Sequence, residues 1–466
     1  MKTTSRFPLT VIILISLLAT SLWPTAQVKA ATAAKQETIP AALVLEIKEA
    51  QYYHMLSSSF FKNYNSSVTK LAYHDAMAQL YYLLTDIWTE PTARVYKDEK
   101  AYSVLQLAKL ELLKPETSKT FNSSAQMDPT DAKALFKRVL AKAASSPKLT
   151  KNGFMAPNYA DREQWLNDQF ASLMGSDRTL SVADTVALTN RAYKQFGIII
   201  AKSEFDLGKA AALRVKFVIR DAETRKVYDA AKKLLSSAVK PGMDDFAKEL
   251  AIHDALADKV SYDWDALDNI FSDAYWASGA LLRGKAVCQG YAYALELLLN
   301  MAGIEAHFIS GQALTKDWSG HAWVKAKIDG SYTNIDVTWN DQDEFGQTDY
   351  TYFNVTDKEY SYDHRADKEF WPAAVDTSVN YYKKSGKWVE DEETYLRLIN
   401  EAIASGSPGI SLRIGNNLDM DNLPFLGEKV WDKLEGFSGS GNGMMRTITY
   451  VFRYKSEADS DNDEKS

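Results

Sequence analysis

The spacing of apolar residues changes twice along the chain, which predicts three regions of different architecture. In the first region, residues 31–205, apolar side chains recur at helical spacing over 41–64 and 68–88. Asp128 before Pro129 is typical of a helix start, because the carboxylate can cap the first amides and proline fits the first helical position. We expect this region to be α-helical, and it contains no motif that indicates chemistry.

In the second region, residues 206–375, apolar residues recur at helical spacing in some segments and alternate with polar residues, as in strands, in others. The helical spacing predicts helices at 221–238, 244–260 and 293–301. Two segments of alternating residues, 321–328 and 331–339, flank Asp329-Gly330, a dipeptide typical of two-residue β-hairpin turns. The region is therefore predicted to be an α+β domain with an antiparallel hairpin.

The third region, residues 376–455, predicts a small module without a chemical motif. The spacing of its apolar residues indicates strands at 381–389, 410–414 and 447–454 and helices at 392–404 and 421–434. The expected order of elements is β-α-β-α-β. The last residues, 456–466, are acidic and rich in serine, so we expect a disordered tail.

The first 30 residues have the layout of a secretory signal peptide. Lys2 and Arg6 precede an apolar run over 9–18, and small residues around Ala30 fit a cleavage site. The alternative is an uncleaved membrane anchor, but the run is shorter than the roughly 20 residues that a bilayer requires. We predict a secreted, extracytoplasmic protein with no transmembrane segment after cleavage of residues 1–30.

Composition excludes several classes of protein. Of 466 residues, 46% are hydrophobic and 25% charged, as in globular proteins. The net charge of −7 argues against a nucleic-acid partner, which would require a basic surface. Cys288 is the single cysteine, so an intramolecular disulfide and a zinc site of several thiolates are excluded. We expect no metal site and no cofactor.

Cys288 is placed where a nucleophilic thiol would be expected. The helix predicted over 293–301 puts the cysteine near a helix N-terminus, where free amides and the helix dipole favour the thiolate. Gly284 and Gly290 leave room for another part of the chain to approach. A buried structural cysteine explains the local sequence equally well.

The predicted hairpin brings a histidine close to an aspartate. If Asp329-Gly330 forms the turn, Ile328 faces Ser331 and the same register sets Asp336 opposite Trp323. His321 lies two residues from Trp323, on the same face and diagonal to Asp336, within reach of its carboxylate. A thiol, an imidazole and a carboxylate in this order indicate a Cys-His-Asp triad, in which the aspartate orients the histidine and the histidine takes the thiol proton.

These motifs resemble the transglutaminase-like superfamily. The similar segments are 287–292 around Cys288, 321–323 around His321 and 336–339 around Asp336. The resemblance implies a papain-like fold in which a nucleophile helix packs on an antiparallel sheet. It also implies that Cys288 is the nucleophile, His321 the base and Asp336 the orienting acid. The side chains expected to line a substrate cleft are Trp276, Gln289, Tyr291, Trp323 and Trp339.

The resemblance further implies acyl transfer or hydrolysis at amide bonds of a protein or peptide through a thioester on Cys288. Cross-linking, proteolysis and deamidation all remain open, and cell-envelope proteins are among the expected substrates. A non-catalytic module that binds peptide or cell-wall material is the alternative. The backbone N–H of Cys288 is one candidate oxyanion donor, and the sequence assigns no second one. We expect His253 and His364 to be structural.

Overall fold

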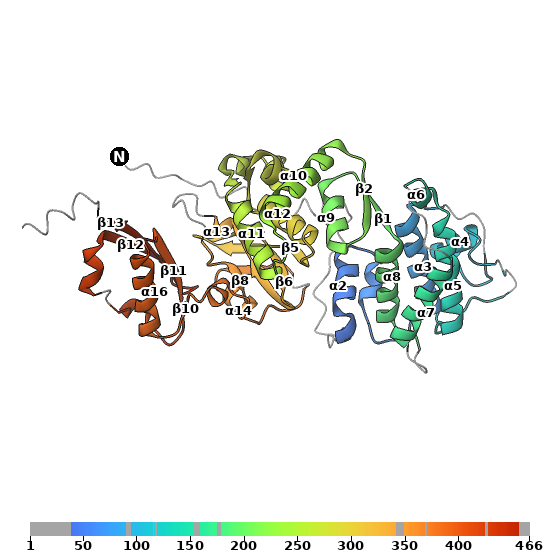
Figure 1. Ribbon diagram of the computed structural model, residues 1–466. Coiled ribbons are helices and arrows are strands. Elements are labelled where there is room, and N and C mark those ends of the chain that lie inside the picture. The colour runs from blue at the N-terminus through green and yellow to red at the C-terminus, as the bar shows by residue number, and fades with distance from the viewer. Residues whose placement is uncertain are drawn as a thin grey trace, which may run out of the picture. The chain divides into compact units, whose positions relative to one another are not determined.

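The computed structural model describes residues 39–89, 95–114, 116, 119–152, 159–174, 179–341, 349–368, 371–424 and 427–455 (Figure 1). The predicted signal peptide at 1–30 and the predicted tail at 456–466 lie outside the described residues. The described chain forms two compact units. One contains the residues up to 226 together with 371–372, and the other contains 227–368 and 373–455. No helix among the described residues is both long and apolar enough to cross a membrane.

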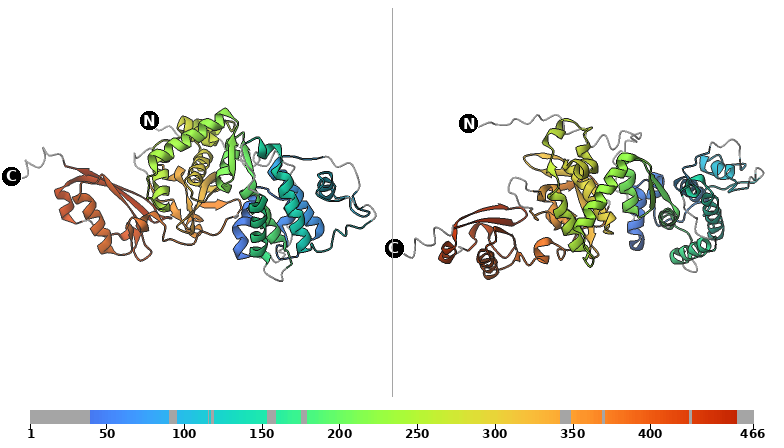
Figure 2. Two further views of the ribbon diagram at one scale, coloured as in Figure 1. Left: turned by 45° about the vertical axis from the view of Figure 1, so that its right-hand side comes forward. Right: turned by 45° about the horizontal axis from the view of Figure 1, so that its top comes forward.

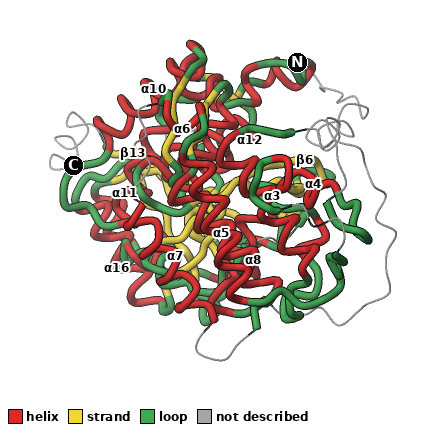
Figure 3. Tube along the Cα trace, turned by 90° about the vertical axis from the view of Figure 1, so that its right-hand side faces the viewer, coloured by secondary structure: helices red, strands yellow, loops and turns green. Residues whose placement is uncertain are grey.

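The first unit is built mainly of helices, as the spacing of its apolar residues predicts. Figure 3 shows several of them side by side in red, and α3 contacts α4, α5, α6 and α8. The elements are η1 (Ala41–Leu43), α2 (Val44–Tyr52), η2 (Ser58–Phe61), α3 (Lys70–Thr85), α4 (Tyr102–Lys109), α5 (Pro129–Ala144), α6 (Pro147–Thr150), α7 (Tyr159–Met174), α8 (Val182–Phe196), β1 (Ile198–Ala201), α9 (Glu204–Leu213) and β2 (Lys216–Ile219).

Side-chain caps define where these helices begin. The Asp128 carboxylate accepts hydrogen bonds from the amides of Thr130 and Asp131, as expected from the Asp-Pro dipeptide. Ser181 and Asp184 form a capping box at the start of α8. The helices bury one continuous apolar core.

The expected boundary at residue 205 falls inside a β-α-β unit. Strands β1 and β2 pair in parallel from Ile198↔Lys216 to Ala201↔Ile219, and α9 connects them. A parallel pair requires such a crossover, and pairing ties the second strand to the first unit. The first unit therefore extends to residue 226, within α10 (Ala222–Ala238).

The second unit contains a five-stranded sheet in the order β8-β7-β6-β5-β9. All pairings in this sheet are antiparallel, and α12 packs against β5 and β6 (Figure 1). The elements are α11 (Asp245–Ala257), β3 (Ser261–Tyr262), η3 (Trp264–Asp268), η4 (Asp273–Tyr275), η5 (Gly279–Arg283), β4 (Lys285–Ala286), α12 (Cys288–Met301), β5 (Ala306–Leu314), β6 (Trp318–Ile328), β7 (Ser331–Ile335), α13 (Val337–Asn340), β8 (Phe353–Val355), α14 (Asp357–Tyr360) and β9 (His364–Ala366).

The predicted hairpin register is confirmed. Ile328 faces Ser331 and Val324 faces Ile335, as a two-residue turn requires. Asp329 and Gly330 both have positive φ, 50° and 88°. Two successive residues of positive φ give the primed turn whose twist matches that of the flanking strands.

The end of the chain differs from the predicted β-α-β-α-β order. The helix expected over 392–404 is confirmed, but 421–434 contains 3₁₀ turns and an additional strand follows. Figure 2 shows the resulting hairpin beside a helix in orange and red, and its sheet has the order β10-β11-β13-β12. The elements are α15 (Tyr381–Lys384), β10 (Trp388–Val389), α16 (Glu392–Ala404), β11 (Gly409–Ile414), η7 (Met420–Asn422), η8 (Glu428–Asp432), β12 (Leu434–Asn442) and β13 (Thr447–Tyr454).

Candidate active site

Cys288 is the first residue of α12, as the sequence predicts. Its thiol is half-buried, and the preceding Val287 has the extended backbone of an N-cap. A Cβ on Gly290 would lie 2.2 Å from the carbonyl oxygen of Ala274, so only glycine lets η4 approach the helix start. The sulfur therefore lies beside the unpaired amides of a helix N-terminus, which favour an anion.

His321 and Asp336 contact each other across the strands. His321 Nε2 is 2.6 Å from Asp336 Oδ2. The second carboxylate oxygen accepts hydrogen bonds from the amides of Thr338 (3.0 Å) and Trp339 (3.2 Å), because Asp336 is also the N-cap of α13. Asp336 is 1% exposed, so these partners fix a buried carboxylate toward His321.

The charges of this pair stabilise each other. Burial by itself would lower the pKa of His321, but the charge of Asp336 and hydrogen bonds with Asp336 and Cys288 raise it to about 10. Burial would raise the pKa of Asp336, but His321 and His364 hold it well below its usual range. An imidazolium and a carboxylate are thus the stable forms at neutral pH. The hydrogen bond between Cys288 and His321 connects the thiol to the imidazole, which in turn contacts the carboxylate of Asp336.

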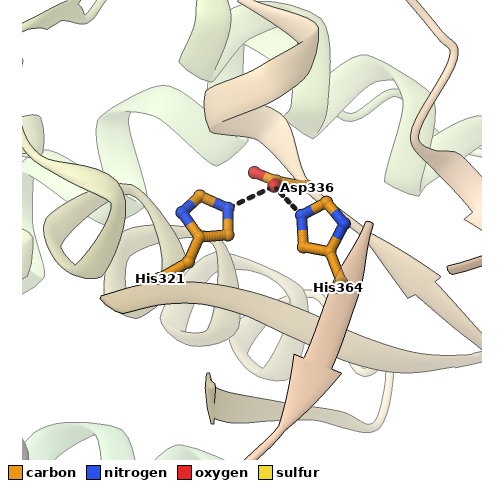
Figure 4. Close-up of side chains that lie close together, drawn as sticks. All are labelled: His321, Asp336 and His364. Atoms are coloured by element: carbon orange, nitrogen blue, oxygen red, sulfur yellow. Dashed lines mark hydrogen bonds and ion pairs between the residues drawn. The ribbon is translucent and has the colours of Figure 1, made fainter. Parts of the chain in front are cut away.

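A second histidine lies on the opposite side of the carboxylate (Figure 4). His364 Nε2 is 3.5 Å from Asp336 Oδ2, and His364 Nδ1 is 2.6 Å from Asp363 Oδ1. Ligand atoms of His321, Asp336 and His364 lie within 4.8 Å of one another, a spacing compatible with a metal ion. In this arrangement, however, both imidazoles contact the same oxygen, so the groups pair with one another instead of surrounding an ion.

His253 supports the segment that carries the aspartate. It is fully buried, its Nδ1 is 2.9 Å from Asp254 Oδ1 and its Nε2 is 3.1 Å from Asn340 Nδ2. Asn340 Oδ1 accepts the amide hydrogen of Tyr352, and the Asn340 amide donates to the carbonyl of Asp336. These contacts hold the short helix α13 in place without touching the carboxylate of Asp336.

Two tyrosines lie around Cys288, and neither was among the side chains that the sequence predicted for the site. The backbone N–H of Cys288 donates to the Tyr262 hydroxyl, and burial is the main cause of the strongly raised pKa of that phenol. Parallel pairing of β3 with β4 places Tyr262 beside Ala286, two residues before Cys288. Tyr275, from η4, packs in the same cluster, and its hydroxyl is buried without a hydrogen-bond partner among the described residues.

Arg283 connects the two segments that carry these tyrosines. Its guanidinium lies 2.6 Å from Asp273 Oδ1, in η4, and 3.5 Å from Asp263 Oδ2, directly after β3. Asp263 is largely buried, so its contact is shielded from solvent more than that of Asp273. The arginine thereby holds both tyrosine-bearing segments next to the helix start.

The expected cleft residues fall into two groups. Trp276 is 41% exposed and stacks on Tyr293, and Trp339 is half-buried with its ring 5.4 Å from that of His321. Both are accessible near the site. Gln289 is half-buried, and its Nε2 donates to the carbonyl of Tyr275 and so holds η4.

The other two expected cleft residues are buried. Tyr291 is fully buried, and its hydroxyl donates to the carbonyl of Val260 (2.9 Å). Trp323 is 3% exposed, and its Nε1 donates to Asn334 Oδ1. These side chains support the helix and the sheet from within and do not line an open surface.

Comparisons with known proteins identify the segment that contains these groups. Residues 232–337, which include Cys288, His321 and Asp336, match the family model described as the transglutaminase-like superfamily. The chain is also similar to a crystal structure of a TGase, with 23% identity over 29% of this chain and 37% of that chain and a TM-score of 0.24. A protein provisionally described as a cysteine protease from Cytophaga hutchinsonii shows 23% identity over 24% of this chain and 37% of that chain, with a TM-score of 0.20.

These matches define how far the likeness extends. No curated protein matches the chain. The chain spans 37% of the length of each of the two solved structures. The predicted resemblance to the transglutaminase-like superfamily is confirmed for residues 232–337, and so is the α+β class with a transglutaminase-like core. This is a fold that thiol enzymes use.

The raised pKa of His321 predicts how stability depends on pH. The pairing of protonated His321 contributes in full to the free energy of unfolding below pH 6.5, the pKa of histidine in the unfolded chain. This contribution is lost as pH rises through about 10, the pKa of His321 in the folded protein. We expect His321→Gln to lower the melting temperature at pH 7, as measured by calorimetry. The difference in melting temperature between this variant and the wild type should narrow toward pH 10. His74→Gln is the control, because burial lowers the pKa of His74 to about 4 and its effect should not change above pH 7. A difference for His321→Gln that stays constant from pH 7 to 10 would contradict the prediction.

Proposed function

We propose that the protein is a thiol enzyme that transfers or hydrolyses the acyl group of protein or peptide amides through a thioester on Cys288. The observation that carries this proposal is a series of contacts. The half-buried sulfur at the start of α12 is hydrogen-bonded to His321, and His321 contacts the buried carboxylate of Asp336. If Cys288 or His321 had only a structural role, it would not need to lie in contact with the other members of a Cys-His-Asp triad.

The proposed reaction begins with the proton of the thiol on His321. The Cys288 thiolate attacks the carbonyl carbon of the amide, forming a C–S bond and a tetrahedral oxyanion. His321 then gives its proton to the departing nitrogen as the C–N bond breaks, which leaves a thioester. Water or an amine attacks the thioester, His321 takes the proton of that nucleophile, and the thiolate is released. Asp336 stays ionised throughout and holds the imidazole in orientation.

The oxyanion requires donors that are already in position. The backbone N–H of Cys288 is one, and the Tyr262 hydroxyl, to which this N–H donates, supplies the second. A raised pKa keeps the phenol protonated at any working pH, so its O–H remains available. In the free protein the hydroxyl oxygen occupies the N–H, and we expect the acyl oxygen to replace this contact and to accept from both groups.

The enzyme is further proposed to act outside the cytoplasmic membrane. The support is the sequence of residues 1–30, with its basic start, short apolar run and small residues at the end. Cell-envelope proteins and peptides would then be its accessible substrates.

Mass spectrometry of a protein mixture tests the reaction. We expect wild-type protein, in the presence of a reductant, to form isopeptide products, new peptide ends or Gln-to-Glu conversions, according to which nucleophile resolves the thioester. Cys288→Ala should abolish them, because no other thiol exists in the chain. Products that persist in Cys288→Ala would refute the thioester route, and a wild type without any product would refute the enzymatic proposal.

A pair of Tyr→Phe variants tests the oxyanion donor. Tyr262→Phe should lower kcat by roughly 10²–10³ with little change in KM, because one donor to the developing oxyanion is lost. Tyr275→Phe is the matched control, since its hydroxyl makes no hydrogen bond with a described residue and its removal should leave kcat within a few-fold. Equal kcat values for the two variants would exclude Tyr262 as a donor.

Secretion is tested by expressing the full chain in a bacterial host and analysing the exported protein. The N-terminus of the mature protein, determined by mass spectrometry, should follow the small residues at Ala30 or Ala33. A chain retained in the cytoplasm with residues 1–30 intact would overturn this part of the proposal.

A further inference from the structure

His364 forms a second histidine–aspartate pair behind the catalytic one. Its Nδ1 lies 2.6 Å from Asp363 Oδ1, and its Nε2 is directed at Asp336 Oδ2 at 3.5 Å (Figure 4). That nitrogen has no other partner in the described part of the chain. Both His364 and Asp363 are 1% exposed, so neither can exchange these contacts for water.

The sheet explains how the two histidines reach one carboxylate. Strand β5 pairs with β6 on one side and with β9 on the other, so His321 lies opposite Gly311 and His364 lies opposite Ala313. A Cβ on Gly311 would lie 2.3 Å from the carbonyl oxygen of Arg365, so glycine permits this close approach. Both imidazoles are therefore carried by strands of the same sheet.

Aromatic packing fixes the ring of His364. Tyr360 stacks on it with ring centroids 3.9 Å apart, and the Trp339 ring lies at 4.4 Å. Its partner Asp363 also accepts the hydroxyl hydrogen of Tyr352, at 2.6 Å. Asn442 Nδ2, at the end of β12, donates to that hydroxyl at 2.9 Å. The ring can neither rotate nor move away without breaking several contacts.

We propose that His364, held by Asp363, is a positioning residue that keeps the Asp336 carboxylate directed at His321. The inference rests on the proposed function, because it assigns a role toward the same triad. The amides of α13 hold Oδ1 of Asp336, and His364 contacts Oδ2, the oxygen that faces His321. Without His364, only the Tyr360 hydroxyl, at 3.5 Å, remains beside His321 as a side-chain contact of Oδ2 among the residues that the structure describes, so this oxygen is held less firmly toward His321. His321 is then oriented less firmly toward Cys288 and takes the thiol proton less readily.

Two variants of His364 separate positioning from simple packing. Gln can place an amide N–H where Nε2 lies and so keep a donor to Asp336, whereas the shorter Asn can reach only Asp363. The readout is the rate of alkylation of Cys288 by iodoacetamide at pH 6–7, since Cys288 is the single thiol and the reagent needs no acyl substrate. We expect His364→Asn to slow alkylation about tenfold and His364→Gln to stay within about threefold of the wild type.

His307→Asn is the matched structural control. It also removes a buried histidine that pairs with a nearby carboxylate, Glu305, but His307 lies on β5 and makes no contact with Asp336 or with α13. It should lower the melting temperature while the alkylation rate of the folded protein stays within about threefold. If His364→Asn does not fold, Asp363→Asn, which keeps the imidazole but weakens its support, should slow alkylation in the same direction.

The outcomes distinguish this inference from the proposed function. Equal slowing in His364→Asn and His364→Gln, or none in either, would overturn the positioning role while leaving the thiol chemistry intact. A wild-type thiol whose alkylation follows an ordinary titration with a midpoint near 8.5 would overturn the proposed function itself, and the positioning role with it.

Discussion

A buried negative charge is the constraint on which the candidate site depends. Moving a carboxylate out of water costs several kcal/mol unless charges and hydrogen bonds replace the lost hydration. Asp336 finds this replacement in two backbone amides on one oxygen and in two imidazoles on the other. The donors come from α13, β6 and β9, so the sheet order and the short helix after β7 must all be correct before the charge is tolerated. Fold and chemistry are thereby coupled at one side chain.

The sequence was most informative where structure is local. A two-residue turn leaves one register, so Asp329-Gly330 was sufficient to bring His321 and Asp336 onto one face. Strong helix formers after Cys288 located the start of α12 in the same way. Both arguments involve residues that are close along the chain, where spacing alone determines direction.

The remaining groups depend on contacts between distant segments. His364 reaches Asp336 only because β9 pairs with β5, and Tyr262 reaches Cys288 only through a two-residue parallel pair. Neither pairing is indicated by the spacing of apolar residues, so the sequence predicted only a structural role for His364. In the C-terminal module, β12 was missed because glycines at 436, 439 and 441 give it little strand propensity. Its pairing with β13 supplies what the local sequence lacks.

The low exposure of the His–Asp pair has a consequence for proton traffic. Only 6% of the His321 side chain and 1% of the Asp336 side chain meet solvent, whereas Cys288 at the helix start is half-buried. Bulk water and buffer ions therefore have little direct access to the imidazole. A proton that His321 holds can leave mainly toward the sulfur and whatever is bound there. The His321–Asp336 pair therefore exchanges its proton mainly with the thiol and the bound substrate. Buffer concentration should have little influence on the rate at which His321 gains or loses its proton.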